Sequence, residues 1–140
     1  MRFMIIVKAT KDSEAGAMPG ERLIADMAAF HEELAKAGML LDASGLKPSG
    51  AGWRIRYAGE KRTVVDGPFA ESKELVAGYT LIRAGSREEA LAWTKRFPNP
   101  AVDGGAAEIE VRPLYELEDF GPSEAMERFR ELGVAGGKPA

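Results

Sequence analysis

The sequence predicts a single α+β domain, in which an antiparallel sheet of four to five strands carries two helices on one of its faces. A helical pattern with one apolar stripe spans residues 21–37, and Ser86 with Glu89 three positions later forms a capping box that opens a second helix. Short segments of β-strand composition, bounded by Gly and Pro, lie between and around these helices. A chain of 140 residues, 45% hydrophobic and 29% charged, has the size and composition of one domain with one core.

The first strand and the first helix have the simplest patterns. Residues 3–7 are apolar on both faces, which is typical of a central strand. The polar segment 11–20 ends in Pro19-Gly20 and predicts a loop before the helix. Gly38 follows the helix at the position where a left-handed residue commonly ends one. The apolar face of this helix contains Leu23, Ile24, Met27, Phe30, Leu34 and Ala37.

A hairpin is predicted in the middle of the chain. Residues 39–46 predict a second strand, and the alternation of apolar and polar residues over 53–58 predicts a third. Residues 58–61 supply a turn, and residues 63–65 predict the returning strand of the hairpin. This strand ends at Asp66-Gly67-Pro68-Phe69, because Pro donates no ladder hydrogen bond. Residues 75–82 predict another strand.

The C-terminal third contains the second helix, a last strand and a tail. The helix that Ser86 opens is expected to stop at Pro98, and residues 106–114 predict the last strand. The tail contains a short amphipathic helix at 124–132 and a Gly-rich end at 133–140 that we expect to be frayed. We therefore expect a domain at 1–117 and a C-terminal tail at 118–140.

The order of these elements is that of a split βαβ arrangement with an inserted hairpin, which places both helices on one sheet face. The other face then stays uncovered. We expect Trp53 and Tyr57 to contribute to an apolar patch there, and a second copy of the chain to cover it. The sequence thus predicts a dimeric ferredoxin-like fold, assembled as a homodimer through the open sheet face.

Composition excludes several classes of function. The chain has no Cys, so it has no thiolate nucleophile, disulfide or Cys-based zinc site. A formal charge of −3 with scattered Lys and Arg residues argues against a nucleic-acid partner. No run of 18 apolar residues and no signal-peptide pattern is present, so we expect no membrane partner and a cytoplasmic location.

One segment of nine residues resembles the signature of the DGPF family, a branch of the YCII-related proteins. Its sequence is Asp66-Gly67-Pro68-Phe69-Ala70-Glu71-Ser72-Lys73-Glu74. Residues 30–38, Gly78-Tyr79, the helix start at Ser86 and residues 110–113 are also similar to this family, so the resemblance covers roughly 1–117. The resemblance implies a dimeric α+β barrel and a cleft in which a His and an Asp lie close together. Some members of the family are associated with extracytoplasmic-function sigma factors.

His31 and Asp66 are the candidate catalytic residues. His31 is the only histidine and lies within the apolar arc of its helix, so it is expected to face the sheet, where it either exchanges protons or packs as a core-edge histidine bonded to a backbone carbonyl. Asp66 either caps its strand through an Asx-type turn or acts as a carboxylate beside the imidazole. Only the resemblance brings the two residues together.

Lys73, Glu74 and Arg112 are the candidate substrate-binding residues. Glu71, Lys73 and Glu74 form either a solvated charge run or part of a cleft that attracts an anion. Arg112 either pairs with Glu110 two positions before it or holds a ligand carboxylate. One His without Cys does not make a usual transition-metal site, and no nucleotide-binding motif occurs, so we expect no metal and no cofactor.

Two functions remain open from the sequence. The first is a cofactor-free acid–base enzyme that acts on a small carbonyl-bearing or anionic metabolite, with His31 and Asp66 as the proton-transfer pair. The second is a non-catalytic module that binds a small molecule or a protein and has a regulatory role linked to a sigma-factor pathway. The fold alone selects neither.

Overall fold

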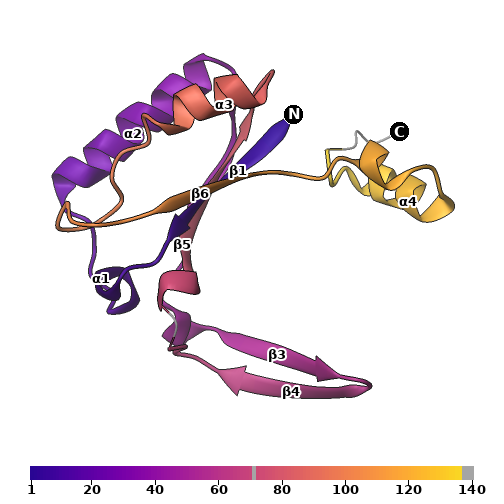
Figure 1. The fold of residues 1–140 in the computed structure, drawn as a ribbon, viewed down its shortest axis with the longest axis horizontal. Coiled ribbons are helices and arrows are strands. Elements are labelled where there is room, and N and C mark those ends of the chain that lie inside the picture. The colour runs from indigo at the N-terminus through magenta and orange to yellow at the C-terminus, as the bar shows by residue number, and fades with distance from the viewer. Residues whose placement is uncertain (71, 137–140) are drawn as a thin grey trace.

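A four-stranded antiparallel sheet with two helices on one face forms the body of the computed structural model, which describes residues 1–70 and 72–136 (Figure 1). The sheet order is β2-β5-β1-β6, the order of a ferredoxin-like fold, and the fold class predicted from the sequence is confirmed. The elements, with η for short 3-10 helices, are β1 (Arg2–Lys8), α1 (Lys11–Glu14), α2 (Glu21–Lys36), β2 (Leu40–Gly45), η1 (Ser49–Ala51), β3 (Trp53–Ala58), β4 (Lys61–Asp66), η2 (Ser72–Glu74), β5 (Val76–Arg83), α3 (Arg87–Thr94), β6 (Ile109–Pro113), η3 (Leu117–Phe120) and α4 (Glu124–Leu132).

The core lies between the sheet and the helices α2 and α3. Alternate residues of β1, Phe3 and Ile5, are buried there against Ile82 of β5 and Leu34 of α2. Fully burying side chains such as Ile5, Leu34 and Ile82 contributes about 1.5–3 kcal/mol each. The amphipathic pattern of α2 therefore fixes which of its faces meets the sheet.

The helix ends follow the signals in the sequence. Gly38, just beyond the last turn of α2, has φ +73°, a left-handed conformation that glycine adopts without strain. At the start of α3 the hydroxyl of Ser86 accepts a hydrogen bond from the backbone N–H of Glu89 at 3.1 Å. The predicted positions of both helices are thus confirmed, although α3 ends at Thr94, before Pro98. Within the predicted loop 11–20 the short helix α1 occurs.

The predicted hairpin is present, but it lies apart from the main sheet. Strands β3 and β4 pair with each other in a separate two-stranded ribbon that projects away from the helices (Figure 1). Trp53 and Tyr57 lie on this ribbon with 64% and 65% of their surface exposed. Our expectation that they belong to the open face of the main sheet is therefore wrong, because alternation with period two predicts a strand but not the sheet it joins.

The open face of the main sheet is lined instead by residues of its two central strands. Met4 pairs with Leu81 and Ile6 pairs with Tyr79 on neighbouring positions of β1 and β5, and all four side chains are half-buried. They point away from the core because Phe3, Ile5, Thr80 and Ile82 alternate with them and are buried on the helix side. An apolar strip thus crosses the face that the helices leave free.

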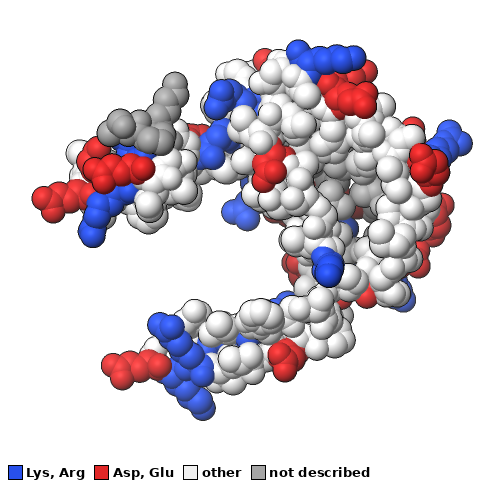
Figure 2. Space-filling view, turned by 180° about the vertical axis from the view of Figure 1, so that it is seen from behind, with Lys and Arg blue, Asp and Glu red and all other residues white. Residues whose placement is uncertain are grey.

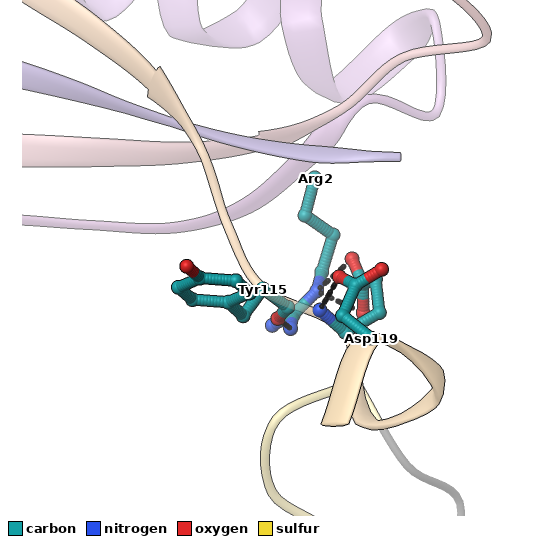
Figure 3. Close-up of polar contacts among 4 residues, drawn as sticks. Arg2, Tyr115 and Asp119 are labelled. Carbon is teal, nitrogen blue, oxygen red and sulfur yellow. Dashed lines mark hydrogen bonds and ion pairs between the residues drawn. The ribbon is translucent and has the colours of Figure 1, made fainter. Parts of the chain in front are cut away.

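The chain beyond β6 forms a second projection, residues 115–136, which we call the C-terminal arm. Helix α4 has the bounds predicted from the sequence; Ser123 caps its start, and Gly133 with φ +73° follows its end. Figure 3 shows how the arm is held at its root, where Nε of Arg2 donates to both carboxylate oxygens of Glu116 at 3.0 and 3.2 Å. Residues 137–140, part of the end predicted to be frayed, lie outside the described residues.

Candidate functional site

His31 lies on the third turn of α2 and faces β5, as its place in the apolar arc predicts. Its Nδ1 lies 2.7 Å from the backbone oxygen of Met27, one turn earlier in the helix. Its Nε2 lies 2.8 Å from the hydroxyl oxygen of Thr80 on β5. The imidazole is half-buried, whereas Thr80 is buried with 2% of its surface exposed. The side chain therefore connects the helix layer to the sheet.

These two contacts fix the tautomer of the neutral imidazole. A backbone carbonyl only accepts hydrogen bonds, so Nδ1 of His31 carries the proton and donates it to Met27. Nε2 then presents its lone pair, and the hydroxyl of Thr80 donates to it. In the imidazolium form Nε2 would donate and the Thr80 oxygen would accept. Both ring nitrogens thus have hydrogen-bond partners within the chain.

Aromatic rings surround the imidazole on its inner side. The rings of Phe30 and Phe97 meet it edge to face, with centroid distances of 5.7 and 6.0 Å. Phe30 and Phe97 also contact each other, and Phe30 contacts Trp93 of α3. The packing of these rings restricts the orientation of the histidine.

Asp66 lies elsewhere, as the last residue of β4 at the base of the hairpin. It is paired with Trp53 across the ribbon and is exposed. Both ring nitrogens of His31 have partners other than Asp66, so within one chain the expected His31–Asp66 contact is replaced by contacts to Met27 and Thr80. Nothing in the sequence distinguishes Thr80 from an ordinary strand residue.

The residues that follow Asp66 pack against the η1 loop instead. A Cβ on Gly67 would lie 1.9 Å from the backbone oxygen of Ser49, so only glycine fits at this position. The backbone N–H of Phe69 donates to the hydroxyl of Ser49 at 3.0 Å, and Ser49 in turn donates from its N–H and hydroxyl to Glu14 at 2.9 and 2.5 Å. The motif thus has a structural role in joining the hairpin base to η1 and α1.

The candidate substrate-binding residues are dispersed. Lys73 and Glu74 are exposed in η2, and Glu71 lies outside the described residues. Arg112 has 72% of its side chain exposed and lies 3.9 Å from Glu110, which also contacts Lys8 at 3.5 Å. The ion pair expected between Glu110 and Arg112 is present, and such an exposed pair contributes little stability.

An open hollow of about 610 Å³ lies between α2 and the segment 96–104 that follows α3. Its polar lining comes from Arg22, Asp26, Glu33, Arg96 and Asn99, and Arg96 forms an ion pair with Glu33 across it. None of the sequence-predicted site residues lines this hollow. Within residues 1–70 and 72–136, no group of three His, Asp or Glu side chains is arranged to hold a metal ion.

A family model for the YCII-related domain matches residues 1–115. The chain belongs to the YCII-related family. The match includes His31, Asp66 and every strand of both sheets, and it ends where the C-terminal arm begins. The YCII-related domain is thus the four-stranded body together with its hairpin.

Two individual proteins are also similar to this chain. An uncharacterized protein of Rhizobium meliloti is 33% identical over 96 residues, which cover 69% of this chain and 77% of the relative. Among solved structures, the chain resembles 5-chloro-2-hydroxyhydroquinone dehydrochlorinase from Burkholderia phenoliruptrix, determined with 2,5-dihydroxybenzoquinone. That likeness has a TM-score of 0.45 and 14% identity, and covers 83% of this chain and 95% of the other. In the parts of this YCII-related chain that are described, no helix is long and apolar enough to cross a bilayer.

Proposed function

We propose that the protein is an acid–base enzyme acting on a small carbonyl-bearing or anionic molecule without a cofactor, with His31 as the proton-transferring group. The observation that supports this is the pair of hydrogen bonds that hold the imidazole. Nδ1–H donates to Met27, so the base Nε2 has a defined position and a defined tautomer. General bases in enzymes are commonly oriented in this way through the nitrogen that does not react.

The hydroxyl of Thr80 has a specific part in this proposal. The Thr80 hydroxyl donates to the single lone pair of Nε2, so in this proposal it rotates away from the ring as Nε2 takes a proton from a substrate. The reverse rotation accompanies return of the proton to the product. The buried position of Thr80 makes it a positioning residue and not a nucleophile.

The remaining candidates have proposed roles in binding a substrate. Arg112, whose contact with Glu110 is loose, is proposed to hold a substrate carboxylate by a bidentate contact. Lys73 and Glu74 are proposed to attract and orient the substrate from η2, and Asp66 to supply a second carboxylate from the hairpin base.

We propose that the chain forms a homodimer through the open sheet face, which lies opposite the face that His31 contacts. The apolar strip formed by Met4, Ile6, Tyr79 and Leu81 is the surface that a second copy would cover. Charged groups border the strip, with Lys8, Glu110 and Arg112 on one side and Asp42, bonded to the Tyr79 hydroxyl at 2.9 Å, on the other. Sedimentation equilibrium tests this: the wild type is expected to be a dimer, and Leu81→Asp to dissociate it.

A second candidate function is a non-catalytic binding module. It is favoured by the fact that both nitrogens of His31 are already bonded within the chain, as expected for a packing histidine. In this case the imidazole stabilises the helix–sheet contact, and a ligand binds elsewhere on the dimer. The two candidates differ in whether a ligand contacts the imidazole.

The single histidine makes this difference directly measurable by NMR, because every imidazole signal belongs to His31. We would screen small carboxylates, lactones and phosphorylated metabolites by thermal shift and record the ring signals with each hit. Under the enzyme proposal, a hit moves these signals, loses its thermal shift in His31→Gln, and is turned over only by a chain that contains His31. A hit that stabilises His31→Gln as well as the wild type, with unmoved ring signals, would favour the binding module.

A further inference from the structure

Two projections that extend on the same side of the molecule are left without a partner in one chain. In Figure 2 the β3–β4 hairpin and the C-terminal arm enclose a wide hollow, on the side of the body away from the helices. Among the residues described, no hydrogen bond or ion pair joins the two projections. Each therefore presents its surface to whatever enters the hollow.

The hairpin by itself lacks the contacts that make a β-ribbon stable. Most of its side chains are exposed, including the large apolar residues Trp53, Ile55, Tyr57 and Val64, which are 64%, 44%, 65% and 63% exposed. Isolated two-stranded hairpins are at best marginally stable in water, so a ribbon with this composition is expected to pack against another surface.

The C-terminal arm has a similar excess of exposed apolar side chains. Tyr115, Phe120, Phe129 and Leu132 are 72%, 56%, 44% and 72% exposed. The arm is nevertheless held at its root by Arg2, whose guanidinium also donates to the backbone oxygen of Tyr115 at 3.3 Å, while the backbone N–H of Glu116 donates to Asp119 at 2.8 Å (Figure 3). The direction in which the arm leaves β6 is thus set by contacts to β1.

The two projections carry opposite charge. Residues 53–66 of the hairpin contain four basic and two acidic side chains, a formal charge of +2. Residues 115–136 of the arm contain six carboxylates and two arginines, a formal charge of −4. A symmetric dimer can place either unlike or like projections together, and like pairing would bring charges of the same sign into contact.

We propose that in the homodimer the basic hairpin of each protomer packs against the acidic C-terminal arm of the other. The inference rests on the proposed homodimer and adds to it the orientation of the two chains and a role for the arm, which lies beyond the family match except for Tyr115. Apolar residues of both projections form the centre of each contact, and the charged residues of opposite sign surround it. The contact occurs twice because of the symmetry.

Cross-linking between single-cysteine variants tests the orientation, since the chain has no native Cys. Thr63 on β4 and Ala125 on α4 are exposed and lie on the hairpin and on the arm. Thr63→Cys and Ala125→Cys chains of different mass are allowed to exchange subunits and are treated with a short bismaleimide. The expected product joins the two different chains, in clear excess over products that join two like chains.

The outcomes separate this inference from the homodimer itself. If wild type sediments as a dimer but only Thr63→Cys chains are linked to each other, or no product forms, the projections do not pair and the inference is overturned while the homodimer stands. If wild type is monomeric at concentrations used for sedimentation, both proposals fail. If the hairpin instead binds another macromolecule, the dimer forms without cross-links, and the inference is overturned while the homodimer stands.

Charge exchange provides an independent readout. The variant Arg56→Glu/Lys61→Glu is expected to weaken dimerisation roughly tenfold, because it places acidic side chains against the acidic arm. Adding Glu118→Lys/Glu131→Lys to the same chain is expected to restore dimerisation. The variant Glu118→Lys/Glu131→Lys alone is expected to weaken dimerisation. The matched control Lys36→Glu/Lys95→Glu makes the same charge change on the helix layer, and should leave the dissociation constant unchanged. Weakening without restoration by the combined variant would contradict the pairing.

Discussion

Nε2 of His31 and the hydroxyl oxygen of Thr80 lie 2.8 Å apart, although 49 positions separate the two residues in the chain. The contact crosses from α2 to β5 and is the side-chain hydrogen bond through which the candidate acid–base group is attached to the sheet. Because Thr80 is buried, the contact has consequences both for stability and for the position of the imidazole.

Thr80→Val keeps the shape of the side chain but removes its hydroxyl. It leaves Nε2 of His31 without its partner, so we expect the free energy of unfolding to fall by about 1–3 kcal/mol. Thr80→Ser retains the hydroxyl and is expected to restore the ring signals of His31 seen by NMR, at the smaller cost of one methyl group. Urea unfolding measures the first effect. Equal loss in the two variants, with unchanged ring signals, would show that the hydrogen bond is unimportant.

Gly67→Ala tests the close approach of the hairpin base to η1. The added Cβ would lie 1.9 Å from the backbone oxygen of Ser49, so the backbone must move, and we expect a loss of about 1–3 kcal/mol. Gly50→Ala is the matched control in the same contact, because its nearest atom beyond its chain neighbours is Cβ of Pro68 at 4.0 Å. Thermal unfolding of both variants should show a clearly lower midpoint for Gly67→Ala only.

Ser49→Ala removes the hydroxyl that donates to Glu14 and accepts from the N–H of Phe69. We expect a loss of about 1–3 kcal/mol, since one partner is a carboxylate, and faster hydrogen exchange of the Phe69 amide. Ser44→Ala, at an exposed position of β2, is the control and should change neither quantity. An unchanged exchange rate for Phe69 would refute the role given to Ser49.

Arg2 and Glu116 form the bifurcated contact at the root of the C-terminal arm, with 15% and 30% of their side chains exposed. A double-mutant cycle with Arg2→Gln and Glu116→Gln is expected to give a coupling energy of up to about 1 kcal/mol, decreasing as salt is added. Limited proteolysis should cut the arm faster in either variant. A coupling energy of zero at low salt would mean that other contacts hold the arm.

Much of the body of the fold is predictable from local patterns. The apolar stripe of α2, the glycine after it and the serine before α3 are signals contained within a few residues, and the structure places each where local chemistry requires. The amphipathic helix α4 follows from the same kind of pattern. Short-range periodicity thus identifies elements and the faces they bury.

The parts that were missed depend on contacts between distant segments. The inward direction of His31 follows from the helical wheel, but the identity of its partner depends on the register between α2 and β5, which no local pattern encodes. Ser49 and Glu14 likewise meet across 35 positions, and nothing in either residue's neighbours predicts the contact. For Trp53 and Tyr57 the strand was predictable, whereas its separation from the main sheet was not, since that depends on which strands find hydrogen-bond partners.

The hairpin also bears on how the protein avoids aggregation. In the described chain β3 and β4 pair only with each other, so each has an outer edge whose backbone N–H and C=O groups are available to any passing strand. Arg54, Arg56, Lys61 and Arg62 are distributed along these edges. Lysine and arginine at such positions disfavour the addition of further identical strands, because each added copy repeats the same charges. The ribbon's basic side chains would therefore keep the molecule dispersed whenever its apolar surface is uncovered, for example during synthesis.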